Sequence, residues 1–172
     1  PIIILTILLV ATPAVGQEEP PGLETIATGL GFTEGPAAAP DGTLYFTDIP
    51  RGRIHRLEQD GTISTWLEDP GKCNGLMFNA EGILFACRFG GNEVVRIDPV
   101  SREVVPIASQ YRGSPFITPN DLVLDSVGGL YFTDPDYGRG PDPPQDKEAV
   151  YYRDAEGSIT RLVDNLKRPN GV

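Results

Sequence analysis

Short apolar or alternating stretches recur along the chain, each about five or six residues long and separated by turns. Alternation of apolar and polar residues is typical of strands that face a core on one side. Asp-Gly or Glu-Gly pairs stand between several of these stretches, at 41–42, 60–61, 81–82 and 156–157, and such pairs favour tight hairpin turns. No stretch of the sequence keeps a helical period. The pattern therefore predicts an all-β protein.

The stretches group into three units of four strands. The expected strands are Glu34–Ala38, Thr43–Asp48, Arg53–Leu57 and Thr62–Leu67 in the first unit, Asn74–Phe78, Ile83–Arg88, Glu93–Ile97 and Glu103–Ile107 in the second, and Asn120–Asp125, Gly129–Asp134, Ala149–Arg153 and Ser158–Val163 in the third. A four-stranded sheet this small cannot bury both of its faces alone, so it must stack on neighbouring sheets around an axis. The sequence therefore predicts a β-propeller. Residues 23–29 are expected to add one more strand ahead of the first unit.

Each unit opens on a polar residue, and a fourth such residue follows the third unit. They are Glu34, Asn74, Asn120 and Asn170, at intervals of about 40 to 50 residues, the length of one propeller blade. The first strand of each blade lines the central channel, so equivalent positions converge near the axis. One carboxylate and several amide oxygens form an all-oxygen set that suits a hard divalent cation. The Pro-rich stretch 135–147 lies on the same face and is expected to overhang the channel mouth.

The first sixteen residues differ in composition from the rest of the chain. Residues 1–16 carry no charge, are rich in Ile and Leu, and end in Ala14-Val15-Gly16, which is typical of the apolar core and cleavage site of a secretory signal. A short buried helix or a membrane anchor is the alternative, but the run is short for a membrane span. We expect export to the periplasm or the extracellular space and a linker over 17–22. Because no initiator Met is present and a fourth unit has only opened at the C-terminal end, we expect a chain truncated at both ends.

Acidic side chains outnumber basic ones by 24 to 14, which gives a formal net charge of −10. Such a chain repels nucleic acid and anionic membrane surfaces, so neither is expected as a partner. Export places Cys73 and Cys87 in an oxidising compartment. The strand register that would bring them together is not fixed by the sequence, so a disulfide and two buried thiols both remain open.

Four motifs follow one another in order: TEGP with PDGTLYFTD, then NGLMFNAEG, then PNDLVL with GGLYFTDPDYG, and then RPNGV. From about Leu23 to Val172 the chain resembles the gluconolactonase/regucalcin (senescence marker protein) family. The resemblance implies a six-bladed propeller, of which this chain would cover about three blades as the N-terminal half of a lactonase domain over 23–172. It also implies one divalent metal in the channel and hydrolysis of sugar lactones. Ca²⁺ fits the ligand types best, and Mg²⁺, Mn²⁺ and Zn²⁺ remain open.

The resemblance assigns roles to particular residues. Glu34 and Asn170 match metal ligands of the family, and Asn120 matches a residue that contributes to the metal or to the substrate. The family's general base is an Asp in a later P-D-G motif, a segment that lies beyond Val172. Thr118 stands where the regucalcin branch has a substrate-binding Arg, which favours the bacterial gluconolactonase branch.

Other positions carry two interpretations each. Asn74 is either a turn residue or a substrate contact. Arg88 and Tyr137 are expected on the site face, as contacts to sugar hydroxyls or as ordinary surface residues. Asp121 either orients Asn120 or caps a turn.

Two aspartates and the single histidine are assigned no part in the chemistry. Asp48 and Asp134 end equivalent strands and are expected to be structural repeats. His55, in a charged strand, is expected on the outer face.

The chemistry predicted from these residues is polarisation of a lactone carbonyl by the channel cation and attack by water. A serine nucleophile is disfavoured because the chain has no G-x-S-x-G elbow and its only histidine has no obvious partner. The alternative from another class is an exported, non-catalytic propeller that binds a ligand or a protein. The isolated segment is expected to be inactive as an enzyme.

Overall fold

The computed structural model of the chain describes residues 22–68, 70–138 and 140–172. The expected secretory signal over 1–16 and most of the expected linker lie outside these residues. Within the described part, every regular element is a strand and no helix is long and apolar enough to cross a membrane.

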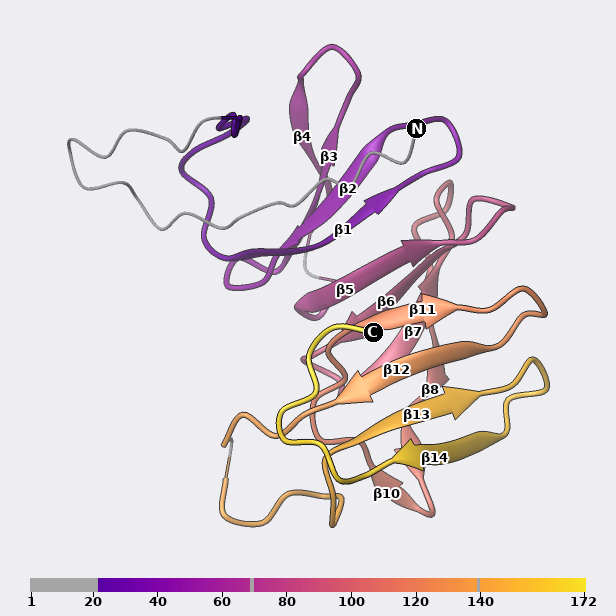
Figure 1. Cartoon of the computed structure of the whole chain (residues 1–172). Helices are drawn as coiled ribbons and strands as arrows, with labels where there is room; N and C mark the ends of the chain where they lie inside the picture. Colours follow the sequence, from indigo (N-terminus) through magenta and orange to yellow (C-terminus); the bar gives the residue numbers. More distant parts are fainter. Residues whose placement is uncertain (1–21, 69, 139) are drawn as a thin grey trace.

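Three four-stranded antiparallel sheets follow one another along the chain, each with its strands in sequence order (Figure 1). The first holds β1 (Thr33–Ala38), β2 (Leu44–Asp48), β3 (Arg53–Leu57) and β4 (Ile63–Glu68). The second holds β5 (Cys73–Phe78), β6 (Leu84–Arg88), β7 (Glu93–Ile97) and β8 (Val104–Ala108). The third holds β11 (Leu122–Leu124), β12 (Leu130–Asp134), β13 (Ala149–Arg153) and β14 (Ile159–Val163). The three predicted units and their strand order are confirmed.

Two expectations about strands were wrong. Residues 23–29 form no strand, because a strand needs a paired edge and no described strand pairs with this segment. A small hairpin of β9 (Gln110–Tyr111) and β10 (Ser114–Pro115), which the sequence analysis did not predict, follows the second sheet. The first strand of the third sheet is also shorter than the expected Asn120–Asp125, because the Asn120 carbonyl accepts a hydrogen bond from the neighbouring sheet.

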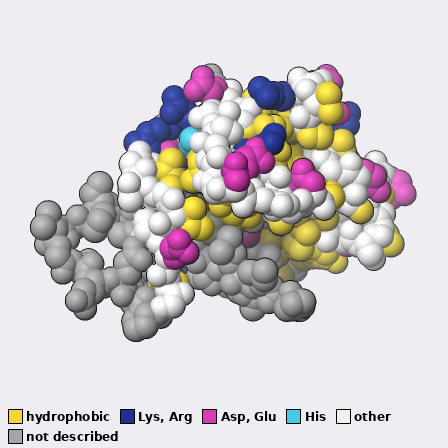
Figure 2. Space-filling model, turned by 90° about the horizontal axis from the view of Figure 1, so that it is seen from above, with side chains coloured by type: hydrophobic (Ala, Val, Ile, Leu, Met, Phe, Trp, Pro, Cys, Tyr) yellow, Lys and Arg dark blue, Asp and Glu magenta, His cyan; other side chains and the backbone are white. Residues whose placement is uncertain are grey.

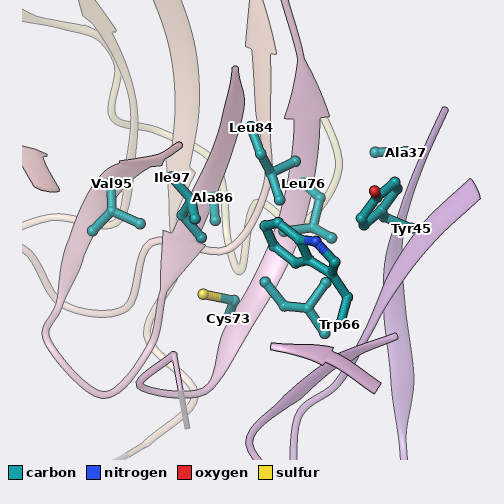
Figure 3. Packing of buried hydrophobic residues seen from close by; sticks show 10 residues of the cluster. Ala37, Tyr45, Trp66, Cys73, Leu76, Leu84, Ala86, Val95 and Ile97 are labelled. Atoms are coloured by element: carbon teal, nitrogen blue, oxygen red, sulfur yellow. The ribbon is translucent and has the colours of Figure 1, made fainter. Parts of the chain in front are cut away.

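The second sheet is packed between the other two, as stacked propeller blades require. One cluster joins Trp66 of β4 to Leu76 and Leu84 of the second sheet, and Figure 3 shows the Trp66 ring directed at both leucines. A second cluster joins the opposite face of the second sheet to the third, around the fully buried Phe132 and Tyr151. Burial on both faces explains why β6 and β7 read as nearly continuous apolar runs.

The two cysteines are free and lie in different clusters. Cys73 packs in the cluster shared with the first sheet, and Cys87 packs in the cluster shared with the third. Because their side chains point to opposite faces of the second sheet, they cannot meet to form a disulfide. Of the two alternatives that the sequence left open, the structure therefore shows two buried thiols and excludes the disulfide.

His55 was wrongly expected as an outer-face residue. Its side chain is only 6% exposed and its ring stacks on Phe46 with the ring centroids 5.3 Å apart. Burial lowers the pKa of His55, and the nearby charges of Arg53 and Arg51 lower it further. Figure 2 shows basic side chains gathered near the single histidine. His55 is therefore a neutral packing residue and takes no part in the site described below.

The first strands of the three sheets lie together. β5 lies beside β1 and also beside β11, so β1, β5 and β11 form the inner edge shared by all three sheets (Figure 1). The convergence predicted from the repeat is confirmed at the level of the backbone.

Candidate functional site

Glycines let the inner strands approach one another closely. Gly35 has a φ of +53°, and a Cβ there would lie 2.1 Å from the carbonyl oxygen of Asn74. A Cβ on Gly75 would lie 2.8 Å from the carbonyl oxygen of Asn120, to which the Gly75 N–H donates over 2.8 Å. Only glycine fits at such contacts. The polar residues that open successive units are therefore fixed next to one another by their own neighbours in the sequence.

Threonine hydroxyls connect the backbones of these units. Thr47 on β2 has its Oγ1 3.0 Å from the carbonyl of Glu34 and 3.1 Å from that of Asn74. Thr133, at the equivalent position on β12, donates to the carbonyl of Asn170 over 2.6 Å. The sequence analysis missed this role, although the Thr-Asp pair repeats at 47–48 and 133–134.

The two repeated aspartates that follow these threonines are structural, as predicted. Asp48 accepts hydrogen bonds from the N–H groups of Gly31 and Phe32 at 2.9 and 3.3 Å. Asp134 accepts them from Ile117 and Thr118 at 3.0 and 2.6 Å. Each carboxylate thus fixes the segment that leads into its sheet. Burial raises the pKa of Asp134 to about 6 in spite of these two donors.

Two carboxylates occupy the inner edge. Burial raises the pKa of Glu34, and the charge of Asp121 raises it further. Burial also raises the pKa of Asp121, whose Oδ2 accepts a hydrogen bond from the N–H of Val172 over 3.3 Å. Carboxylates whose pKa values are raised by burial or by a neighbouring like charge are typical of a functional site.

Asp121 takes the place that glycine holds in the other units. Gly35, Gly75 and Gly171 each follow the opening polar residue, whereas Asp121 follows Asn120. A Cβ on Gly75 would lie 2.3 Å from Asp121 Oδ1, so this carboxylate fills the space between neighbouring inner strands. The break in the glycine pattern was the signal in the sequence for a second carboxylate at the site.

The long connection from β12 to β13 reaches the site through Tyr137. The Asn170 Nδ2 donates a hydrogen bond to the Tyr137 hydroxyl over 2.8 Å. Burial raises the pKa of Tyr137, and the charge of Glu34 raises it further, so this hydroxyl also lies within the electrostatic reach of Glu34. Farther along the loop, the buried Gln145 donates from Nε2 to the carbonyls of Ser114 and Pro115 at 2.7 and 2.9 Å. The loop is thus fixed to the β9–β10 hairpin at one end and reaches the site at the other.

For Asn120, Asn74 and Arg88, the described contacts involve the backbone or residues other than the carboxylates of the inner edge. Asn120 is only 5% exposed, and the hydrogen bonds described for it involve its backbone. The carbonyl of Asn74 contacts Thr47. Arg88 pairs with Glu93, and no contact among the described residues links Arg88 to the carboxylates of the inner edge.

A groove of about 360 Å³ runs along the inner edge. Its walls are residues of β1, β5 and β11, with Asp121 and Val172 among them. Asp121 is the acidic residue among its walls.

A protein-family model described as the SMP-30/Gluconolactonase/LRE-like region matches residues 32–172. The chain belongs to this family. Membership agrees with the three blade-like sheets and with the polar residues at their inner edge.

Curated relatives and a solved structure match this chain over about half of their own length. A gluconolactonase from Zymomonas mobilis is 29% identical over 169 residues, which cover 87% of this chain and 48% of that protein. Lactonase drp35 from Staphylococcus haemolyticus is 28% identical over 177 residues, covering 94% of this chain and 52% of that protein. The structure of a gluconolactonase from Xanthomonas campestris is 30% identical, with a TM-score of 0.80 over 86% of this chain and 52% of that chain. This chain spans about half the length of these relatives, and the likeness confirms the propeller fold.

The donor atoms at the inner edge fit the divalent cation that the family implies. No group of three or more His, Cys, Asp or Glu side chains among the described residues could hold a metal ion. The set here is different: two carboxylates with raised pKa values and the amide of Asn170, whose Oδ1 receives no hydrogen bond from any described residue. Oxygen donors of this kind suit a hard cation, and a positive charge would relieve the repulsion between Glu34 and Asp121.

Proposed function

We propose that the whole protein hydrolyses a sugar lactone with the aid of a divalent cation held in the propeller channel. The observation that carries this proposal is the grouping of Glu34, Asp121 and Asn170 at the inner edge: the charge of Asp121 acts on Glu34, and Asn170 bonds to Tyr137, on which the charge of Glu34 also acts. Family membership and the gluconolactonase and lactonase relatives support the reaction class.

The proposed oxygen ligands are Glu34, Asn120 and Asn170. Glu34 supplies charge, and the two amides supply neutral carbonyl oxygens. When bound there, a cation would polarise the lactone carbonyl and stabilise the negative charge that develops on its oxygen. Oxygen ligands with few charges favour Ca²⁺ over softer metals.

The remaining residues of the site orient the substrate and handle protons. Asp121 has a raised pKa, so its carboxylate takes up a proton more readily than a surface aspartate does. Attack of water on the carbonyl carbon would release one proton, and Asp121 is the proposed acceptor among the residues of this chain. The ring C–O bond then breaks, and its oxygen leaves as a hydroxyl with a proton returned to it. Tyr137 and Asn74 are the proposed partners of the sugar hydroxyls.

The test is hydrolysis of glucono-δ-lactone by the whole protein, followed as acid release, after treatment with a chelator and again after Ca²⁺, Mg²⁺, Mn²⁺ or Zn²⁺ is added back. We expect activity to disappear with the chelator and to return with one of the four cations. Undiminished hydrolysis in excess chelator would rule out the cation. Absence of hydrolysis under every condition would leave a non-catalytic binding propeller as the better account.

A further inference from the structure

Asn170 opens the fourth repeated unit, and its backbone and its side chain are fixed by different residues. The carbonyl oxygen accepts a hydrogen bond from Thr133 Oγ1 over 2.6 Å, which fixes the main chain. The side chain remains exposed and has only one described partner, the hydroxyl of Tyr137, which accepts from Nδ2 over 2.8 Å. An amide has a donor end and an acceptor end, and only the acceptor end binds a cation.

We propose that Tyr137 is a positioning residue that orients the Asn170 amide, holding Nδ2 so that Oδ1 is the end presented to the channel cation. The inference rests on the proposed cation site. With Nδ2 bound to the hydroxyl, the opposite oxygen is directed away from Tyr137 and is left without a described partner. Without the hydroxyl, rotation by half a turn about the last side-chain bond would present the N–H₂ group to the cation instead.

The backbone around Tyr137 and Asn170 keeps the two residues in register. Glu148 Oε2 accepts a hydrogen bond from the N–H of Asp136 over 2.9 Å and another from the N–H of Arg168 over 2.8 Å. Asp136 precedes Tyr137 directly, and Arg168 lies two residues before Asn170. One carboxylate oxygen therefore fixes both flanking segments, so the contact between the two side chains does not depend on a loosely held loop.

The test is calorimetric titration of Ca²⁺, with Mn²⁺ as a second probe, into the whole protein and its variants. Tyr137→Phe keeps the ring and removes only the hydroxyl, and we expect cation affinity to fall about tenfold, as for other residues that orient a metal ligand. Tyr152→Phe is the matched control: its hydroxyl is also hydrogen-bonded to a side chain, donating to Asp125 Oδ2 over 2.8 Å, but at the turn between β11 and β12. Cation affinity of Tyr152→Phe should stay at the wild-type value.

The same substitution in a protein that already carries Asn170→Asp separates loss of amide orientation from loss of packing. Asn170→Asp presents an oxygen whichever way its side chain turns, so it needs no orienting partner. In that background, Tyr137→Phe should lower cation affinity less than about threefold, against about tenfold in the wild type. An equal loss in both backgrounds would overturn the orienting role, as would unchanged affinity in the single variant. If the wild-type protein binds neither of these cations and neither Mg²⁺ nor Zn²⁺, the proposed function fails and this inference fails with it, an outcome distinct from the other two.

Discussion

Gly35→Ala should reduce the stability of the fold far more than an ordinary glycine substitution, because Gly35 lies where β1 and β5 of neighbouring sheets approach closely. An alanine in the left-handed conformation costs about 1–2 kcal/mol in backbone strain. Its Cβ would also lie 2.1 Å from the carbonyl oxygen of Asn74 and 2.9 Å from the Cα of Gly75. The atoms it meets are backbone, so relief requires β1 and β5 to move apart, and overpacking of this kind costs about 1–3 kcal/mol more. The expected total is roughly 2–5 kcal/mol, a large part of the stability of a typical domain.

The measurement is urea denaturation of the whole protein, paired with a control that carries strain alone. Gly61 in the β3–β4 turn has a φ of +86° and nothing within 4 Å of a Cβ, so Gly61→Ala should lose only about 1–2 kcal/mol. Calcium titration adds a second readout, because Gly35→Ala moves Glu34 and should weaken binding, whereas Gly61→Ala should not. If the two variants have equal denaturation midpoints and equal calcium affinities, the inner strands do not approach as described and the basis of the site is lost.

Three further predictions concern the same chain. Thr133→Val keeps the side-chain shape and removes the hydroxyl that holds the Asn170 carbonyl, so thermal unfolding should show a loss of about 1 kcal/mol together with weaker calcium binding. As the pH is lowered, calcium affinity should begin to fall while the pH is still above 4.5, the ordinary pKa of a glutamate. The reason is that the raised pKa values of Glu34 and Asp121 let protons compete with the cation at a higher pH. Without calcium, the stability of the fold should change in the opposite direction and fall as the pH rises through these pKa values. The folded state binds more protons than the unfolded state, and these protons are lost at higher pH. The mature protein from its native host should begin after residue 16, and an intact mass that retains the apolar run would contradict export.

The sheets could be predicted from the sequence because each strand carries its own signal. Alternation, Gly-containing turns and the recurrence of the opening polar residues placed the three units and their strand order correctly. His55 was misplaced because burial on a sheet face depends on what covers it, and a charged strand gives no sign of a ring such as Phe46 across from it. Cys73 and Cys87 could not be decided either, because their facing depends on a register that the sequence does not fix.

The candidate site was predictable only as a set of backbone positions. The repeat places Glu34 and Asn170 at strand starts, but it carries no information on which side chains cross between units. The contact of Tyr137 with Asn170 joins a loop to a different repeat, and Arg88, which the sequence suggested as a substrate contact, forms an ion pair with Glu93. Such contacts depend on tertiary packing between segments that are far apart in the chain.

The central claim is that the carboxylate of Glu34 holds a cation on which lactone hydrolysis depends. Glu34→Gln keeps the size and one carbonyl oxygen and removes the charge, while Glu68→Gln removes an equal charge from an exposed position on β4. The measurement is calcium titration of both variants and the wild-type protein, with hydrolysis of glucono-δ-lactone followed in the same samples. We expect Glu34→Gln to lose most of both cation affinity and hydrolysis with its fold retained, and Glu68→Gln to match the wild type. Full cation affinity and full hydrolysis in Glu34→Gln would contradict the account.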